Sequence, residues 1–194
     1  MFFGSRIMCE FSQAVRLLEC DLDHLIKLSG QGSRYKINWL SIVRNAINPR
    51  FAPVILYRIS VTADKIDLKF VAKGLSFLSY CVFGIEISLE SNIGPGLVLP
   101  HTHGTVIGAQ TIGKNVIIFQ GVTLGAREID FDNDVNKRPV LGDNVIVGAG
   151  AKVLGGIKIG NNVKIGANAV VLNSVPDAAT VVGVPAHIAR RKND

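Results

Sequence analysis

Two histidines, His101 and His103, stand two positions apart in the segment LPHTHG. If that segment is extended, both imidazoles lie on one face of a strand. An imidazole can transfer a proton near neutral pH or bind a metal ion. No third ligand accompanies the pair, so we predict no metal site. A histidine taken alone is more often structural than catalytic, and the elements that position this pair must therefore decide its role.

Three cysteines, Cys9, Cys20 and Cys81, are the other reactive side chains. They form no CxxC pair and are too few for a disulfide framework, so we expect inert thiols in a reducing cytoplasm. The N-terminal segment MFFGSRIMCEF lacks the apolar stretch of a signal peptide. Residues 74–85 are weakly charged but shorter than the ~18 apolar residues of a membrane span. We therefore expect a cytoplasmic chain with no export signal and no transmembrane segment.

The chain is basic overall, with 21 Lys and Arg against 15 Asp and Glu and a net charge of +6. That charge suits a polyanionic partner such as nucleic acid, an anionic membrane or a phosphorylated cofactor. The basic residues are dispersed, and no platform of aromatic side chains accompanies them, so we expect no nucleic-acid binding. A hydrophobic content of 48% over 194 residues excludes a disordered chain.

The composition changes abruptly near residue 86. Eleven of the thirteen aromatic residues precede Ile87, whereas fifteen of the 20 glycines follow it. Upstream, apolar residues recur at helical spacing from Val15 to Ile26 and again from residue 39, and residues 51–62 and 66–83 are typical of two further helices. We predict a small helical domain over residues 1–84 that packs against, positions or oligomerises the second half.

Downstream, large aliphatic residues recur every sixth position. A smaller or β-branched residue follows four positions after most of them, and a glycine often follows directly. Twelve of thirteen positions in the series are Ile, Leu or Val: Ile87, Ile93, Leu99, Thr105, Ile112, Ile118, Leu124, Leu141, Val147, Val153, Ile159, Ile165 and Val171. Stacked short strands would bury this series as one continuous column, with glycine and asparagine at the turns. A β-sandwich would instead require a period of two.

Four segments carry a resemblance to a known family: FGIEISLESNIGPGLVLPHTHGTVIG, IFQGVTLG, VGAGAKVLGGIKIG and VVGVPAHI. The sequence resembles the hexapeptide-repeat acyltransferases, in particular serine acetyltransferases and the serine-acetyltransferase-like O-acetyltransferases of capsule and exopolysaccharide loci. The resemblance implies a mostly β fold, a left-handed parallel β-helix with three sides and eighteen residues per coil. It would cover residues 85–175 with a loop at 127–140, and residues 176–194 would complete the CoA site.

The resemblance also implies a catalytic pair. His101 falls where these enzymes carry their catalytic histidine, and Glu86 falls where they carry its partner aspartate. In an eighteen-residue coil, we expect Glu86 to lie almost directly on the coil below His101, about 4.8 Å away. A carboxylate there would fix the imidazole tautomer and stabilise the imidazolium. His103 occupies the corner of its hexad as a structural or acceptor-contacting residue, because the family chemistry uses no metal.

In the family, acetyl-CoA is the co-substrate and binds between neighbouring subunits, which implies a homotrimer or a dimer of trimers. A backbone amide near Gly125 would stabilise the oxyanion. The arginines of the basic tail would reach the CoA phosphates. By motif position, the cofactor-binding residues are Gly125, Ala149, Lys164, Gly166, Arg190 and Arg191.

The sequence departs from serine acetyltransferases around the acceptor. Pro100 replaces an aspartate that contacts the substrate ammonium in that family. Lys137, Arg138 and Pro139 replace an RHP segment, although Arg138 and Lys137 could still bind a carboxylate, such as that of an acidic sugar. The predicted function is therefore acetyl transfer to a hydroxyl of a capsular or exopolysaccharide glycan, with loop 127–140 recognising the acceptor. The alternatives are a serine O-acetyltransferase and a non-catalytic β-helix scaffold.

Overall fold

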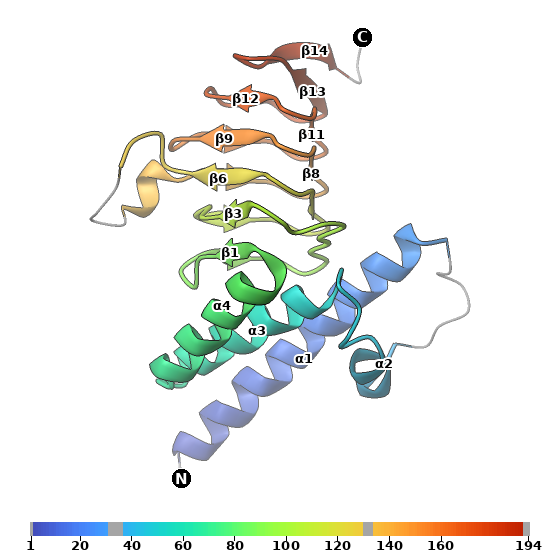
Figure 1. Ribbon diagram of the computed structural model, residues 1–194, viewed down its shortest axis with the longest axis vertical. Helices are drawn as coiled ribbons and strands as arrows, with labels where there is room; N and C mark the ends of the chain where they lie inside the picture. Colours follow the sequence, from blue (N-terminus) through green and yellow to red (C-terminus); the bar gives the residue numbers. More distant parts are fainter. Residues whose placement is uncertain (1, 31–36, 130–133, 192–194) are drawn as a thin grey trace.

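Helices fill the N-terminal part of the molecule and lie at one end of a column of strands (Figure 1). The computed structural model describes residues 2–30, 37–129 and 134–191. The helices are α1 (Phe2–Leu28), α2 (Trp39–Arg44), α3 (Ala52–Lys65) and α4 (Lys69–Phe83). They confirm the helices expected from apolar spacing. Local signals set their ends: the Asn38 side chain accepts a hydrogen bond from the Ser41 amide at the start of α2, and Gly84 ends α4 at a positive φ of 61°.

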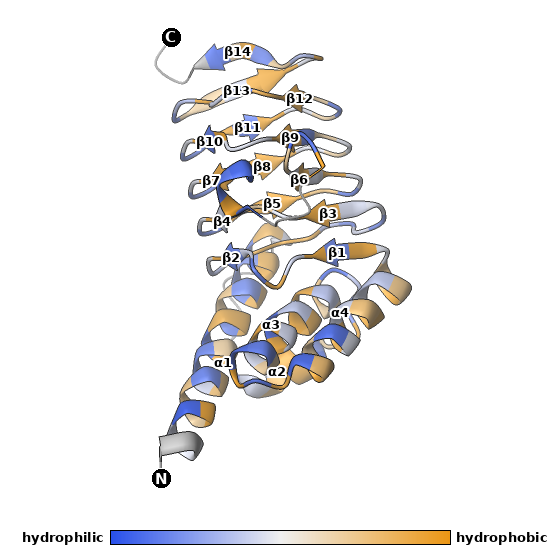
Figure 2. Ribbon diagram, turned by 90° about the vertical axis from the view of Figure 1, so that its left-hand side faces the viewer, coloured by the Kyte–Doolittle hydropathy of each residue, from blue (hydrophilic) through white to orange (hydrophobic). Residues whose placement is uncertain are grey.

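Short strands build the remainder of the described chain. They are β1 (Ile85–Ile87), β2 (Asn92–Ile93), β3 (Thr105–Ile107), β4 (Thr111–Ile112), β5 (Ile117–Ile118), β6 (Thr123–Gly125), β7 (Val140–Leu141), β8 (Ile146–Val147), β9 (Lys152–Leu154), β10 (Lys158–Ile159), β11 (Lys164–Ile165), β12 (Val170–Val171), β13 (Ala179–Val182) and β14 (His187–Arg191), with a 3-10 turn η1 (Val135–Lys137). Apart from β13 and β14, described strands that follow one another in sequence belong to different sheets (Figure 2). All pairings of these strands are parallel except that of β13 with β14. The sheet orders are β1-β3-β6-β9-β12, β10-β7-β4-β2 and β14-β13-β11-β8-β5, so the described strands form a three-sided parallel β-helix.

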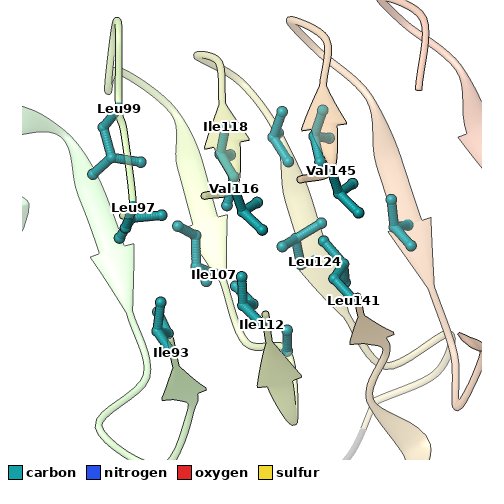
Figure 3. Packing of buried hydrophobic residues seen from close by; sticks show 14 of the residues in the cluster. Ile93, Leu97, Leu99, Ile107, Ile112, Val116, Ile118, Leu124, Leu141 and Val145 are labelled. Atoms are coloured by element: carbon teal, nitrogen blue, oxygen red, sulfur yellow. The ribbon is translucent and has the colours of Figure 1, made fainter. Parts of the chain in front are cut away.

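The hexad series forms the core of this β-helix. None of its thirteen positions is more than 5% exposed, and the aliphatic side chains stack coil upon coil (Figure 3). Thr105, the one polar member, is 1% exposed and donates its hydroxyl to the Phe119 carbonyl oxygen at 3.4 Å. The predicted solenoid column is confirmed, because no single coil could enclose such side chains without its neighbours.

The register is regular in the later coils and irregular in the first. Val170 pairs with Lys152, eighteen residues earlier, whereas Thr105 pairs with Ile85, twenty residues earlier. The hexad count aligns Thr105 with Ile87, but the structure aligns Ile107 with Ile87. Thr105 and Ile107 of β3 both point inward, since residues two apart in a strand share a face, and a six-residue count cannot choose between them.

A buried ion pair joins the helices to the first coil. Arg58 of α3 donates to both carboxylate oxygens of Asp21 on α1, through Nε to Oδ2 at 2.9 Å and through Nη2 to Oδ1 at 3.1 Å. Asp21 is 0% exposed and Arg58 is 4% exposed. The same guanidinium donates to the carbonyl oxygens of Ile93 and Gly94 at 2.7 and 2.6 Å.

Asp21 also fixes the chain that leads to the histidine segment. Its Oδ1 accepts hydrogen bonds from the backbone amides of Gly96 and Leu97 at 2.7 and 2.8 Å. The neighbouring Tyr57 hydroxyl donates to the Ser91 carbonyl oxygen at 2.6 Å. These contacts couple the position of the segment before His101 to the helical part of the molecule.

Candidate active site

The two histidines lie at a corner of the β-helix, between the first coil and the second. The Thr102 hydroxyl donates to the Phe83 carbonyl oxygen at 2.8 Å, and the Gly104 amide donates to the Gly84 carbonyl oxygen at 2.9 Å. The corner therefore sits on the junction of α4 and β1. Gly84 has a positive φ, which favours glycine, and a Cβ atom there would make a tight contact of 3.2 Å with the His103 ring.

An open pocket of about 520 Å³ lies over this corner. His101 and His103 are both exposed there, whereas Thr102 between them is buried. The volume of this pocket is within the range of small-molecule sites. The residues that line it are Pro49, Arg50, Pro100, His101, Thr102, His103 and Gln120.

Glu86 lies on the outer face of β1, and its side chain is exposed. The register places it beside Val106, so the expectation that it lies directly below His101 is wrong. An eighteen-residue coil would already align Glu86 with Gly104, and the twenty-residue spacing between β1 and β3 moves it two residues further from His101. In the described ranges, neither the Glu86 side chain nor the His101 side chain forms a hydrogen bond or an ion pair in this single chain. The catalytic roles of both residues remain predictions.

Sequence reasoning missed the contribution of the helical half to this pocket. Pro49 and Arg50 come from the connection between α2 and α3. Asn48 holds this connection: its side-chain oxygen accepts the Arg50 amide at 3.0 Å, and its carbonyl oxygen accepts the Phe51 amide at 2.9 Å. Phe51 is 1% exposed and anchors the turn in the core. No repeat or motif spacing in the sequence relates Arg50 to His101.

Gln120 is a second pocket residue that sequence reasoning did not single out, although it belongs to the quoted segment IFQGVTLG. Its backbone carbonyl oxygen accepts the Gly150 amide at 2.8 Å, which fixes the chain. Its side-chain Oε1 is buried and has no hydrogen-bond partner among the described residues. A buried carbonyl oxygen without a donor is unusual in folded proteins.

The two cations predicted to bind the acceptor do not line the His101 pocket. Lys137 lines a separate hollow of about 530 Å³ together with Arg127 and Gly156. Arg138 lies beside Gly108, where its Nη1 would be 3.8 Å from a Cβ atom. In a single chain, loop 127–140 therefore does not reach the histidine corner through these two side chains.

Two of the predicted CoA residues lie together. Lys164 and Arg190 line a groove of about 250 Å³ on neighbouring parts of one sheet, because β11 and β14 both flank β13. Ala149 accepts the Asn168 amide, and Gly166 donates to the Val181 carbonyl oxygen, so both serve the stacking of coils.

Gly125 and Arg191 are the remaining two predicted CoA residues. At Gly125, a Cβ atom would meet no heavy atom within 4 Å, so the backbone there is open to a ligand. The side chain of Arg191 lies outside the described residues.

The described ranges contain no group of three or more His, Cys, Asp or Glu side chains that could hold a metal ion. Within the same residues, no helix combines the length and the apolar character needed to cross a membrane. The three cysteines are unpaired and exposed.

Comparison with known proteins gives concordant results. The family profile described as bacterial transferase hexapeptide (six repeats) matches residues 138–173. The serine acetyltransferase of Staphylococcus aureus strain Mu50 is 52% identical over 122 residues, which are 62% of this chain and 55% of that protein. The match thus spans about half the length of this curated relative.

Solved structures extend the likeness over nearly the whole chain. A crystal structure of the Neisseria gonorrhoeae serine acetyltransferase in complex with serine has a TM-score of 0.76 and 31% identity, covering 92% of this chain and 70% of that one. A serine acetyltransferase in complex with CoA has a TM-score of 0.78 and 30% identity, covering 96% and 74%. The β-helix is thus the expected left-handed parallel one. The chain belongs to the hexapeptide-repeat acyltransferases, in their serine-acetyltransferase-like branch.

Proposed function

We propose that this protein is an acetyl-CoA-dependent O-acetyltransferase and that L-serine is its acceptor. The observation that carries the proposal is the exposed His101 at the corner pocket of a β-helix whose relatives are serine acetyltransferases. One of these relatives is seen with serine and another with CoA. The non-catalytic scaffold has no comparable support, since an exposed histidine in an open pocket serves no packing purpose.

The proposed reaction is a direct transfer. His101 takes the proton of the acceptor hydroxyl as its oxygen attacks the thioester carbonyl carbon. The C–O bond forms, the C–S bond breaks, and the imidazolium returns the proton to the departing CoA sulfur. The exposed cysteines have no part in this scheme, because no acyl-enzyme is needed. Glu86 is exposed on the outer face of β1 and does not contact His101 in the single chain, so its proposed role as a positioning residue requires its side chain to turn toward the imidazolium. A backbone amide near Gly125 stabilises the oxyanion.

For the CoA molecule, we propose the groove of Lys164 and Arg190 as the phosphate-binding end. Two cations on the strands that flank β13 suit phosphate groups. Arg191 and the rest of segment 176–194 would complete this site, with Ala149 and Gly166 along the path of the cofactor. The substitution of Lys164 by Gln should therefore raise the KM for acetyl-CoA and leave the KM for the acceptor unchanged.

A neutral sugar hydroxyl is the second candidate acceptor. The observation that favours it is Pro100, which stands in the pocket where the family carries an aspartate. None of the described lining residues is acidic, so an acceptor ammonium finds no carboxylate there in a single chain. A glycan without an ammonium group needs no carboxylate in the pocket. The comparisons nevertheless favour serine, because the relatives named above are serine acetyltransferases.

We also propose a homotrimer, alone or as a dimer of trimers. The position of Lys137 and Arg138 supports it, because these cations can serve the His101 pocket only if a neighbouring subunit supplies them. Light scattering should therefore report an oligomer of three or six chains. An active monomer would contradict the proposal.

The decisive experiment measures CoA release from acetyl-CoA with L-serine and with a panel of neutral and acidic saccharides. Efficient turnover of L-serine supports the main proposal, and turnover of saccharides alone supports the second candidate. The His101→Ala variant measures the background release of CoA by hydrolysis of acetyl-CoA that does not depend on His101. Failure of the wild-type enzyme to release CoA with any acceptor would refute acetyl transfer.

A further inference from the structure

We propose that Arg50 and Gln120 recognise the acceptor and that the pocket selects a hydroxyl compound bearing a carboxylate. The inference rests on the proposed transfer at His101 and deepens it by naming the groups that choose the acceptor. It assigns this role to residues from both halves of the chain, one from the helical part and one from the β-helix.

The charge of the pocket points to an anionic acceptor. Arg50 is the only Lys or Arg among the described lining residues, and no Asp or Glu lines the pocket with it. Within the described chain, Arg50 forms no ion pair, although its backbone is fixed through Asn48. A guanidinium with a held backbone and a free side chain is suited to bind a carboxylate through two parallel hydrogen bonds.

The side-chain amide of Gln120 supplies a complementary hydrogen-bonding group. Its Oε1 is buried without a donor among the described residues, so turning this oxygen toward the pocket, where a ligand N–H or O–H can donate to it, gives it the partner that it lacks. Rotation about the Cγ–Cδ bond exchanges the amide oxygen and nitrogen within nearly the same volume, so either atom can face the pocket. The side chain therefore adapts to a donor or to an acceptor on the ligand.

Together, Arg50 and Gln120 can bind L-serine although Pro100 offers no carboxylate to its ammonium. If the carboxylate of L-serine binds Arg50, its ammonium can donate to Gln120 Oε1, and its hydroxyl remains for His101. The amide oxygen then accepts an ammonium hydrogen that the family aspartate would otherwise take. The same arrangement can bind a uronic acid, because Arg50 binds the carboxylate and Gln120 forms a hydrogen bond with a ring hydroxyl.

The test uses acceptors that differ by one group. L-serinamide lacks the carboxylate of L-serine, 3-hydroxypropanoate lacks the ammonium, and glucose and glucuronate form the matching sugar pair. The wild-type enzyme should prefer the carboxylate-bearing member of each pair that it turns over. Arg50→Gln should raise the KM for that member by about 10- to 100-fold with little change in kcat, and should abolish the preference. Arg50→Lys should retain part of it.

Gln120 is tested through the ammonium. Gln120→Leu should raise the KM for L-serine and L-serinamide by about tenfold and should leave that for 3-hydroxypropanoate nearly unchanged. The control variant is Arg44→Gln, which removes an exposed cation of α2 that does not line the pocket. It should behave as the wild type in every assay.

The outcomes separate the two proposals. If the wild-type enzyme turns over L-serine or a sugar but Arg50→Gln keeps the preference for the carboxylate, the inference is overturned and acetyl transfer stands. The inference is likewise overturned if the wild-type enzyme uses L-serine and L-serinamide equally. If no acceptor releases CoA, acetyl transfer itself fails, and the inference falls with it. Circular dichroism of each variant excludes unfolding as the cause of a lost preference.

Discussion

Substitution of Asp21 by Ala tests whether the buried ion pair holds the helices to the first coil. The carboxylate is 0% exposed and accepts hydrogen bonds from Arg58 and from the amides of Gly96 and Leu97. Its removal leaves a buried guanidinium without its counter-charge and two buried amides without an acceptor. Breaking one partner of a buried pair typically destabilises a protein by about 3–5 kcal/mol, and we expect a loss of this size.

The same helix provides a matched control. Asp23, two residues further along α1, pairs with Lys27, but these side chains are 40% and 62% exposed. An exposed pair at this helical spacing contributes about 0.3–0.5 kcal/mol. Asp23→Ala removes the same chemical group from the same helix, so the difference between the two variants measures burial and not helix propensity.

The assay is urea unfolding followed by circular dichroism, at one fixed subunit concentration for all variants. Asp21→Ala should lower the midpoint far more than Asp23→Ala. The double variant Asp21→Ala with Arg58→Met should be less destabilised than the sum of its single changes, because the two groups interact directly. Equal midpoints for Asp21→Ala and Asp23→Ala would refute the argument that this joint stabilises the fold.

Three further predictions follow from the site and the core. His101→Ala should lower acetyl transfer by about 10²- to 10⁴-fold without loss of acetyl-CoA binding, and near-normal turnover would remove His101 from the mechanism. Burial raises the pKa of Tyr57 to about 12, although the charge of Arg58 acts to lower it. The protonated phenol therefore stabilises the fold fully below pH ~10, and this stabilisation is lost as the pH rises through about 12. The phenolate absorbance of Tyr57→Phe should accordingly lack the late step that Tyr80→Phe retains. Gly113→Ala should destabilise the protein, because its Cβ atom would lie 2.5 Å from the backbone of Gly142. Gly74→Ala in α4 places its Cβ atom within 4 Å of no other heavy atom and should stabilise the protein by about 1 kcal/mol. Thermal unfolding measures both effects.

The β-helix could be predicted from the sequence because each coil repeats one local rule. An inward aliphatic residue every sixth position is visible without any knowledge of distant contacts, and residues such as Leu124 and Val153 are indeed fully buried. The same regularity explains where the prediction failed. In β3, Thr105 and Ile107 both face inward, so the count aligned Thr105 with Ile87, whereas the structure aligns Ile107 with Ile87.

The joint between the halves could not be predicted in this way. Asp21 and Arg58 are 37 positions apart on two different helices, and charged residues on an amphipathic helix usually face water. Only the three-dimensional packing of α1 on α3 shows that both face the first coil. Nor does the sequence alone reveal that the polar groups of Tyr57 and Arg58 bind backbone carbonyl oxygens of the first coil.

The architecture separates two tasks that the pocket must combine. Stacked coils fix the backbone of the histidine corner, since the His103 carbonyl oxygen accepts the Gly121 amide of the next coil and Thr102 is tied to Phe83 below it. Arg50 instead stands on a connection between helices whose repeat-free sequence can vary without disturbing the coils. On the proposal above, changes in the helical half can therefore alter the choice of acceptor while the coil that carries His101 stays the same.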